Sequence, residues 1–252
     1  MRTLDNVNIK GIDVSRHNGS IDWERVKESG ISFAILRAGF GKENPNQIDR
    51  QFEKNYSECK RLGIPVGAYH YSYAVTPADA RSELEFFLKI IGGKQFEYPL
   101  YYDVEDKKLD GCSAKTVTDN IIEFCGGLEK AGYYAGIYCN TYWLNERIER
   151  ERVEGFDIWL ADWRKNPDTR AAKGMWQYSS TGRINGIVGD VDLDIAYKNY
   201  PEIIKSRGLN GFGGSSVKYK ITAEKNNVDP TEAGFIETKL RDLNMSVIKT
   251  EE

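Results

Sequence analysis

The sequence predicts an α/β protein whose strands form a modified TIM-like (β/α) barrel, about (β/α)5(β)3. Three observations support this fold class. Five short apolar runs alternate with amphipathic helical segments, a glycine follows each helical segment, and three more apolar runs follow residue 141 with little room for helices between them. Such near-continuous apolar runs are typical of parallel strands that are covered on both faces. An open doubly wound sheet is the alternative, although the sequence has neither a GxGxxG motif after a strand nor a GxxxxGK[ST] motif.

The expected elements follow in order along the chain. Strands are predicted at residues 9–15, 32–39, 64–72, 98–105, 133–140, 158–163, 174–179 and 189–197. Helices are predicted at residues 22–29 and 48–62, from Pro77 to Gly92 and from Ser113 to Gly132. Thr76 is the expected N-cap before Pro77, and proline favours the first position of a helix. Five βα units in series predict right-handed crossovers, and eight strands predict a closed barrel over residues 1–208.

The last part of the chain has a different composition. Residues 209–216, LNGFGGSS, are typical of a Gly/Ser linker. Residues 217–252 are predicted to form a small β-α-β unit, because Asp229-Pro230-Thr231-Glu232 resembles a helix start with a capping acid. This unit is shorter than the ~40 residues that an independent core usually needs. We therefore expect it to pack on the barrel, to exchange strands with a second copy, or to belong to a larger module.

Composition narrows the classes of partner. The 252 residues are 40% hydrophobic and 29% charged, with a net charge of −3, so no basic surface is expected to attract nucleic acid or an anionic membrane. The four cysteines form no CxxC pair and only two histidines are present, which favours free thiols over a zinc site. The N-terminus lacks the pattern of a signal peptide, so we expect a protein made in the cytosol or one whose leader has been removed.

Acidic residues stand where the predicted strands end. The fourth strand runs into Asp103 and Glu105, which lie two residues apart and therefore point to the same face, about 7 Å apart along the chain. Two like charges at this distance raise the pKa of at least one carboxyl, which gives the protonated acid and ionised carboxylate that glycoside hydrolysis requires. The structural alternative is a solvated strand end or a helix-capping acid. Asp106 falls on the other face and is interpreted as a solvated charge.

Further acids are expected at the same mouth. Asp13 ends the first strand and Asp192 lies in the eighth, and these strands are neighbours in a closed barrel. Asp194 lies deeper in apolar sequence, so its position is left open, and His70 is interpreted as a structural histidine of the barrel. Arg37 is a candidate buried partner for the acids. Four carboxylates could instead hold a divalent metal, but hydrolytic metal sites usually use more histidines, so we expect no metal and no cofactor.

Eight motifs, taken in order, resemble those of glycoside hydrolase family 25, the Chalaropsis-type lysozymes and phage endolysins. They are GIDVS (11–15), RAGFG (37–41), GAYHYS (67–72), DVE (103–105), GIYCN (136–140), IWLADW (158–163), MWQYSS (175–180) and VDLD (191–194). The resemblance covers about residues 8 to 200. It implies a (β/α) barrel that has lost its later helices. It also implies hydrolysis of the β-1,4 bond between N-acetylmuramic acid and N-acetylglucosamine in peptidoglycan.

The resemblance also implies roles for single residues. By motif, Glu105 resembles the general acid, Asp103 the second carboxylate, and Asp13 and Asp192 the flanking acids of the family's site. The residues expected to bind substrate are Arg37, Tyr71, Tyr138, Trp163, Gln177 and Tyr178. The family often has Asn at the position of Asp194. We lean to net retention of configuration assisted by the substrate's acetamido group, with an enzyme nucleophile as the alternative.

Rival functions on the same barrel are a chitinase-like β-N-acetylhexosaminidase and a non-catalytic wall-binding protein. The expected partner is bacterial peptidoglycan. The enzyme would reach the wall either as a phage-type lysin released from the cytoplasm or as a secreted enzyme. For residues 217–252 we expect wall binding or self-association, with a homodimer as one form of the latter.

Overall fold

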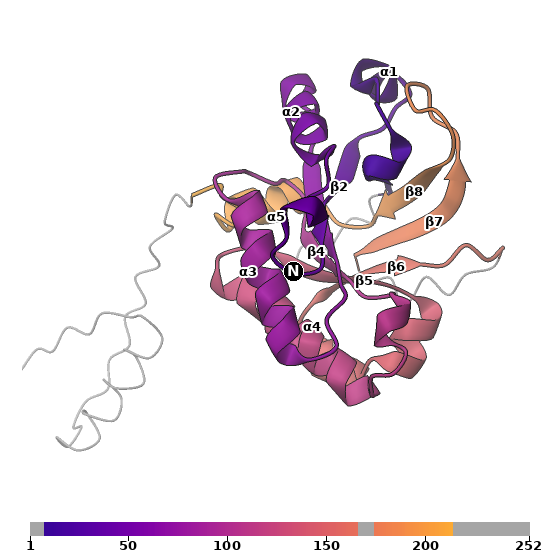
Figure 1. The fold of residues 1–252 in the computed structure, drawn as a ribbon. Coiled ribbons are helices and arrows are strands. Elements are labelled where there is room, and N and C mark those ends of the chain that lie inside the picture. Colours follow the sequence, from indigo (N-terminus) through magenta and orange to yellow (C-terminus); the bar gives the residue numbers. More distant parts are fainter. Residues whose placement is uncertain (1–7, 166–173, 214–252) are drawn as a thin grey trace, which may run out of the picture. The chain divides into compact units, whose positions relative to one another are not determined.

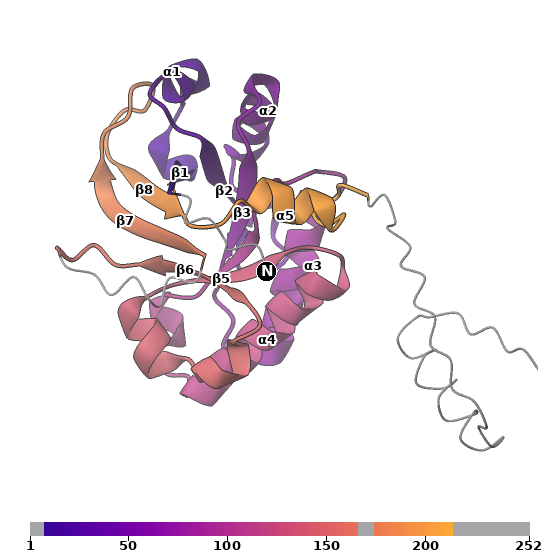
Figure 2. The same cartoon turned by 180° about the vertical axis from the view of Figure 1, so that it is seen from behind.

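The computed structural model describes residues 8–165 and 174–213, which form a closed barrel with the strand order β1-β2-β3-β4-β5-β6-β7-β8 (Figures 1 and 2). The strands are β1 (Ile9–Val14), β2 (Phe33–Phe40), β3 (Val66–Tyr71), β4 (Leu100–Asp103), β5 (Ala135–Asn140), β6 (Asp157–Ala161), β7 (Met175–Gly182) and β8 (Val191–Ala196). The predicted barrel is therefore confirmed. The predicted unit at 217–252, its roles and residues 214–216 of the predicted linker lie outside the described residues.

The direction of the last strand differs from the expectation. Neighbouring strands from β1 to β7 are parallel, whereas β8 is antiparallel to both β7 and β1. The loop 183–190 joins β7 to β8, and it is too short for the crossover that a parallel return needs. The C-terminal end of β8 is therefore not at the mouth. Its first residues lie there instead, which brings Asp192 opposite Asp13 in the β1–β8 register.

The helices that follow the early strands are α1 (Trp23–Glu28), α2 (Phe52–Leu62), α3 (Pro77–Ile91) and α4 (Ala114–Lys130). Thr76 caps α3 through its side chain, and Ser113 caps α4 in the same way. Figures 1 and 2 show α3 and α4 side by side on one flank of the barrel. Between β5 and β6 the chain makes only the short helical turns Trp143–Arg147 and Arg150–Val153. The loss of a full helix after residue 141 is thus confirmed for this connection.

Side-chain alternation divides the core into two layers. Ile12, Leu36 and Tyr102 belong to the cluster that packs the strands against the helices. Phe33, Tyr101 and Trp159 belong to a second cluster inside the barrel. Successive residues of a strand point to opposite faces, so odd-numbered residues of β1 to β4 face the barrel axis. This parity sends Asp13, Arg37, Tyr71 and Asp103 inward.

Aromatic rings fill the barrel interior because glycines leave space for them. A Cβ added to Gly11 would lie 2.3 Å from the ring of Phe33, and one added to Gly136 would lie 2.4 Å from the ring of Tyr101. Contacts under 3 Å between carbon atoms are strongly repulsive. These two glycines therefore let large rings occupy the lower part of the barrel, which closes it below the functional end.

The opposite end of the barrel is closed by α5 (Tyr200–Ser206) and the residues after it. Tyr200 donates to Asp157 Oδ2 at 2.8 Å, and Lys198 Nζ lies 3.1 Å from the same oxygen. Asn210 is fully buried and its side chain donates to the carbonyls of Phe96 and Tyr98. The first residues of the segment predicted as a linker thus pack on the barrel.

A buried polar network holds the connection between β3 and α3. Glu83 is fully buried, and it accepts hydrogen bonds from the backbone N–H of Tyr73 and from the hydroxyl of Tyr102, both at 2.8 Å. The hydroxyl of Ser72 donates to that of Tyr102 at 2.7 Å. Burial raises the pKa of Glu83 to about 7. The network fixes the chain just beyond Tyr71, at the rim of the functional end.

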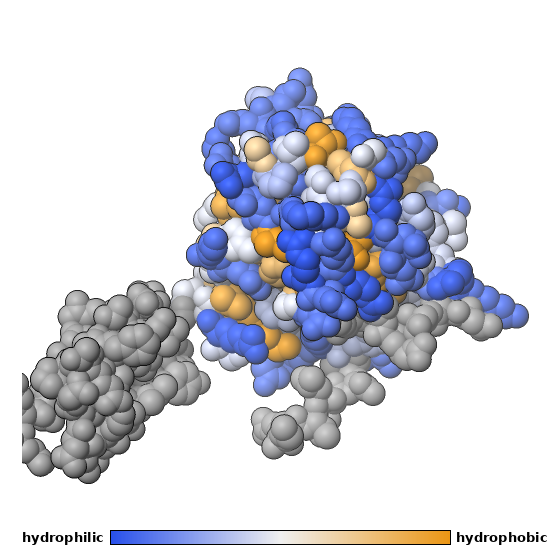
Figure 3. Space-filling model, turned by 90° about the horizontal axis from the view of Figure 1, so that it is seen from below, coloured by the Kyte–Doolittle hydropathy of each residue, from blue (hydrophilic) through white to orange (hydrophobic). Residues whose placement is uncertain are grey.

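The surface carries no sign of a membrane-spanning segment within residues 8–165 and 174–213, since no helix there combines the necessary length and hydropathy. On the face shown in Figure 3, hydrophobic residues form small groups separated by hydrophilic ones. The four cysteines are free thiols, as the sequence favoured, and Cys59, Cys125 and Cys139 are buried.

Candidate active site

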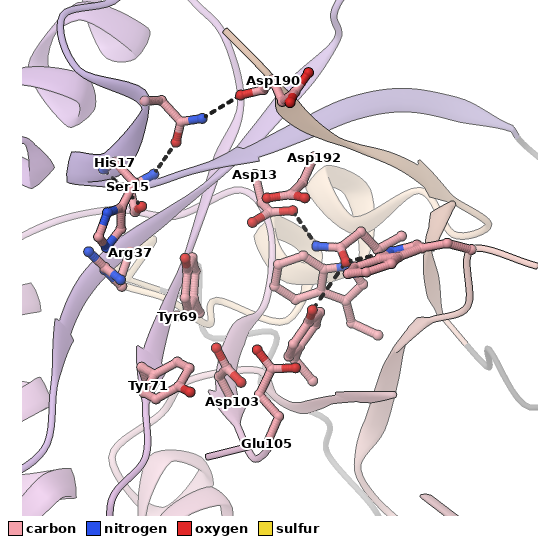
Figure 4. Close-up of a pocket in the computed structure, with 15 residues that line it drawn as sticks. Asp13, Ser15, His17, Arg37, Tyr69, Tyr71, Asp103, Glu105, Asp190 and Asp192 are labelled. Atoms are coloured by element: carbon pink, nitrogen blue, oxygen red, sulfur yellow. Dashed lines mark hydrogen bonds between the residues drawn. The ribbon is translucent and has the colours of Figure 1, made fainter. Parts of the chain in front are cut away.

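A pocket of about 370 Å³ opens at the carboxyl ends of the parallel strands (Figure 4). Its walls combine acidic, aromatic and amide side chains with one arginine and one histidine. The lining residues are Asp13, Ser15, His17, Asn18, Arg37, Tyr69, Tyr71, Asp103, Glu105, Tyr138, Trp159, Trp163, Gln177, Asp190 and Asp192. All four acids predicted to be catalytic are among them.

Asp103 and Glu105 come from the end of β4. The strand itself ends at Asp103, two residues earlier than predicted, but the N–H of Val104 still donates to the carbonyl of Tyr138 at 3.0 Å. Val104 packs into the outer core, so the residues on either side of it both face the pocket. Figure 4 shows the two carboxyl groups side by side on one wall. The same-face prediction is therefore confirmed.

Asp13 and Asp192 form a second pair of carboxyl groups. They are direct partners in the antiparallel β1–β8 register, and Figure 4 shows them next to each other across the pocket from Asp103 and Glu105. Asp13 is 5% exposed, so its carboxyl group has little access to solvent. The pocket thus holds two acid pairs on facing walls.

The side chain of Gln177 connects one acid pair to the aromatic wall. Its Nε2 donates to Asp13 Oδ2 at 2.7 Å, while its Oε1 accepts from the hydroxyl of Tyr138 and from Trp163 Nε1, both at 3.1 Å. Every hydrogen bond of this buried amide therefore has a fixed direction. The network holds Asp13, Tyr138 and Trp163 in one arrangement, which is the kind of support that a preorganised site requires.

Burial raises the pKa values of all four acids, and the charges of neighbouring acids add to the shift for Asp13, Asp103 and Glu105. Desolvation is the largest cause for each of them. The pKa of Glu105 is raised to about 7, with further contributions from the charges of Asp192 and Asp106. The pKa of Asp192 is raised to about 6 by desolvation. The pKa of Asp103 is raised by its burial and by Glu105, although the charge of Arg37 opposes the shift. The site therefore retains protons near neutral pH.

Asp194, whose position the sequence left open, lies below the pocket. It pairs with Gly11 in the β1–β8 register and is fully buried, and its Oδ1 accepts from Trp159 Nε1 at 2.8 Å. Its burial and the charge of Asp192 raise its own pKa, and its charge in turn raises that of Asp13. Asp194 thus acts on the pocket through its neighbours rather than as a lining residue.

Five of the six residues predicted to bind substrate line the pocket, and one does not. Tyr71, Tyr138, Trp163, Gln177 and Arg37 line the pocket, and Trp163 is a rim residue with 56% of its surface exposed. Tyr178 is not a lining residue. Its ring packs against Trp176 at 5.5 Å, on the face of β7 opposite to Gln177, because neighbouring residues of a strand alternate. The strand parity of Gln177 could have removed Tyr178 from the predicted set.

Arg37 lines the pocket but pairs with an acid outside the predicted set. Its Nε donates to Asp49 Oδ2 at 2.8 Å, and Asp49 also accepts from the backbone N–H groups of Arg16 and Gln51. The predicted pairing with the pocket acids is therefore replaced by an ion pair at the side of the pocket. Asp49 gave no signal in the sequence, because it follows a polar loop rather than a strand.

Several other lining residues were not predicted from the sequence. His17 and Asn18 lie in a short helical turn that directly follows β1, and Ser15 caps this turn. The segment SRHN has the form of a cap followed by polar residues, which would have placed these side chains at the mouth. His70, by contrast, is buried among Phe86, Phe87 and Phe124, which bears out its structural interpretation.

Asp106, interpreted as a solvated charge, has two structural contacts. It accepts from the hydroxyl of Tyr71 at 3.0 Å and from the backbone N–H of Lys108 at 2.9 Å, where it caps a short helical turn. The part of the chain that the structure describes contains no group of three or more His, Cys, Asp or Glu residues arranged to hold a metal ion. The chemistry that the pocket offers is that of paired carboxyl groups with raised pKa values, one of which can give a proton while another is ionised.

Comparison with known proteins finds similarity to one glycosyl hydrolase family and to lysozymes. Residues 12–187 match the family model described as glycosyl hydrolases family 25. The autolytic lysozyme of Clostridium acetobutylicum is 30% identical over 187 residues, which cover 74% of this chain and 55% of that protein. The chain thus spans about half the length of this relative.

Two solved structures have the same fold. The modular autolysin LytC of Streptococcus pneumoniae, crystallised with a synthetic peptidoglycan ligand, superimposes with a TM-score of 0.67 and 28% identity, over 75% of this chain and 47% of that one. The bacterial lysozyme of Streptomyces coelicolor gives a TM-score of 0.67 and 27% identity, over 82% of this chain and 100% of that one. With its barrel, its paired acids and a family match over most of its length, this chain belongs to glycosyl hydrolase family 25.

Proposed function

We propose that the protein is an N-acetylmuramidase, which cleaves the β-1,4 bond between N-acetylmuramic acid and N-acetylglucosamine in peptidoglycan. The observation that carries this proposal is the acid pair of Asp103 and Glu105 in a pocket walled by aromatic rings. A glycosidic oxygen needs a proton as its bond to carbon breaks, and Glu105, with a pKa of about 7, can supply it at neutral pH. The similarity to lysozymes and to a peptidoglycan-bound autolysin supports this substrate class.

In the proposed first step, the carbonyl oxygen of the substrate's own acetamido group attacks the anomeric carbon. Glu105 gives its proton to the departing oxygen at the same time, so the glycosidic bond breaks and a cyclic oxazolinium forms. Water then attacks the anomeric carbon, the bond from this carbon to the acetamido oxygen breaks, and Glu105, now ionised, removes a proton from the attacking water. Two displacements at one carbon retain its configuration.

Asp103 is the proposed helper of this route. It is 3% exposed, and its Oδ1 has no hydrogen-bond partner among residues 8–165 and 174–213. A buried carboxyl oxygen without a partner is costly, and an acetamido N–H placed against it would satisfy it. Such an N–H stabilises the ionised form of Asp103. Of the two carboxyl groups, Asp103 is then the ionised one and Glu105 the protonated one. The negative charge then stabilises the positive charge that develops on the oxazolinium.

The products of digestion distinguish the proposed function from its rivals. Purified peptidoglycan should be cut so that the new reducing ends are N-acetylmuramic acid, as identified by mass spectrometry after reduction of the fragments with borodeuteride. New reducing ends on N-acetylglucosamine would contradict the muramidase assignment and favour a hexosaminidase. Walls that sediment with the protein but release no fragments would favour a binding protein.

The pKa of Glu105 predicts the alkaline side of the pH profile. The value of kcat/KM on a soluble glycan should fall above about pH 7, because the general acid is ionised there. Asp106→Asn removes a negative charge that raises the pKa of Glu105, so ionisation becomes easier and the fall should begin at lower pH. The amide oxygen can still cap the helical turn, and the amide N–H group can donate to the hydroxyl oxygen of Tyr71.

Asp110→Asn is the matched control for this measurement. Asp110 is exposed on the same loop, and its charge is not among the causes of the raised pKa of Glu105. Its profile should coincide with that of the unmodified protein. A fall that stays at the same pH in Asp106→Asn would show that a different group controls the alkaline side.

A further inference from the structure

A second cavity of about 270 Å³ lies next to the acid pocket and has the opposite charge. It shares His17, Arg37 and Tyr71 with the acid pocket and adds Arg16, Phe40 and Tyr73. We call this cavity the basic pocket. No carboxyl group is among these six lining residues, whereas five line its neighbour. Figure 4 shows Arg37 and His17 together on one side, away from the two acid pairs.

The two arginines of the basic pocket are held over one ring. The guanidinium carbon of Arg16 lies 5.0 Å from the centroid of Phe40, and that of Arg37 lies 5.6 Å from it. A guanidinium that stacks on a ring keeps its N–H groups at its edge, where they can bind a carboxylate. Phe40 therefore orients both guanidinium groups and accepts no hydrogen bond from their N–H groups.

The guanidinium groups of Arg16 and Arg37 keep N–H donors that have no acceptor among the described residues. Arg37 uses Nε for Asp49, but its Nη2 is buried and makes no hydrogen bond within the described residues. The guanidinium of Arg16 forms no ion pair with any acid in residues 8–165 or 174–213, because Asp49 contacts only its backbone N–H. With one carboxylate for two guanidinium groups, the basic pocket keeps an excess positive charge. A buried donor without a partner is costly, so an anionic ligand would be favoured here.

The two neighbouring cavities determine where a ligand that occupies both can carry a negative charge. A carboxylate would be repelled by Asp103, Glu105, Asp13 and Asp192 but attracted by the neighbouring arginines. A suitable ligand therefore has neutral sugar rings for the acid pocket and a carboxylate on a side branch. Chitin has no such branch. In peptidoglycan, every second sugar has a lactyl group, which ends in a carboxylate or continues into a peptide with carboxylates of its own.

We propose that the basic pocket binds the carboxylate of this side branch and thereby selects the muramic-acid unit of the substrate. This inference rests on the proposed muramidase function and adds a specificity site to it. Arg16 and Arg37 supply the donors and Phe40 fixes their planes. Tyr71 lines both cavities, so it lies where the branch would leave the sugar ring.

The test compares Arg16→Gln with the unmodified protein on three soluble glycans. The first has intact peptides, so that only peptide carboxylates are present. The second has been stripped of peptides and carries free lactyl carboxylates, and the third is the second with these carboxylates converted to amides. Arg16→Gln should lower kcat/KM about tenfold on a glycan whose carboxylate binds in the pocket. It should leave kcat/KM on the amidated glycan unchanged. A loss on the first glycan alone assigns the peptide carboxylate, and a loss on the second assigns the lactyl group.

Arg25→Gln is the matched control, since Arg25 is exposed and lines neither the acid pocket nor the basic pocket. It should behave as the unmodified protein on all three glycans. An equal loss for Arg16→Gln on all three, or no loss on any, would overturn the proposal, provided that thermal melting shows a folded variant.

Binding gives a second measurement that does not depend on cleavage. Adding Arg16→Gln to Glu105→Gln should lower the affinity about tenfold for a glycan whose carboxylate binds in the basic pocket. The affinity for the amidated glycan should not change. If the unmodified protein cuts no glycan at muramic acid, the proposed function fails, while this binding difference still decides whether the basic pocket takes a carboxylate.

Discussion

Glu105→Gln is expected to lower kcat/KM on peptidoglycan by at least about 10²-fold, the usual contribution of a general acid. The substitution keeps the size and the hydrogen-bonding shape of the side chain, but the amide cannot give a proton to the departing oxygen. Turbidity of a wall suspension and the release of reducing ends would both report the loss. Glu85→Gln is the matched control because Glu85 is exposed on α3 and makes none of the contacts of the pocket.

Two further measurements separate loss of chemistry from loss of structure. The pKa of Glu105 is raised by burial, so an ionised Glu105 costs folding free energy above its ordinary pKa. Replacing it by Gln should therefore leave the melting temperature at pH 8 equal or higher. The variant should still sediment with walls. Lysis at the unmodified rate would show that Glu105 is not the acid, and a melting temperature several degrees lower would show that the variant is misfolded.

The parts of the fold that could be predicted are those with a local cause. Caps and apolar periodicity determine the helices, so Thr76 and Pro77 mark the start of α3 correctly. Strand parity depends only on the chain itself. It predicted that Asp103 and Glu105 share a face, and it also excludes Tyr178 once Gln177 points inward. Gln177 and Tyr178 belong to one motif but are adjacent in the strand, so only one of them can face the pocket.

The direction of β8 depends on the length of a connection. Residues 183–190 are too few for a crossover, so the strand must return antiparallel, and its first acid rather than its last reaches the mouth. This length was visible in the sequence. It also explains why Asp192 lines the pocket while Asp194 lies below it.

Contacts between distant segments could not be predicted. Gln177 and Asp13 are 164 residues apart in the sequence, and their hydrogen bond exists because barrel closure pairs β8 with both β7 and β1. The ion pair of Arg37 with Asp49 likewise needs the loop after β2 to fold back beside that strand, as the bridge between Gly39 and Ile48 shows. Neither pair has a sequence spacing that marks it. The basic pocket depends on the same loop, because Asp49 accepts hydrogen bonds from Arg37 and from the backbone of Arg16. It could therefore not be predicted either.

Asp103→Asn is the second variant with a large expected effect. It should lower kcat about 10²-fold with little change in KM, because a fixed negative charge beside the oxazolinium acts mainly in the transition state. The amide oxygen can still accept the acetamido N–H, so ground-state binding is preserved. Initial rates on a soluble peptidoglycan glycan would give kcat and KM separately, and thermal melting would show that the variant is folded.

The fall in kcat has a different cause on each of the two retaining routes. If Asp103 were the nucleophile itself, added azide would replace it and restore turnover to Asp103→Asn with an α-glycosyl azide as product. If the acetamido oxygen attacks, azide opens the oxazolinium from the opposite face and the product is the β-azide. A substrate with a trifluoroacetamido group provides an independent measure, because fluorine withdraws electrons from the attacking carbonyl oxygen. On the proposed route its turnover by the unmodified protein should be much slower than that of the acetamido substrate. Equal turnover of the two substrates, together with an α-azide, would assign the nucleophile to an enzyme carboxylate and leave Asp103 as the group that bonds to the sugar.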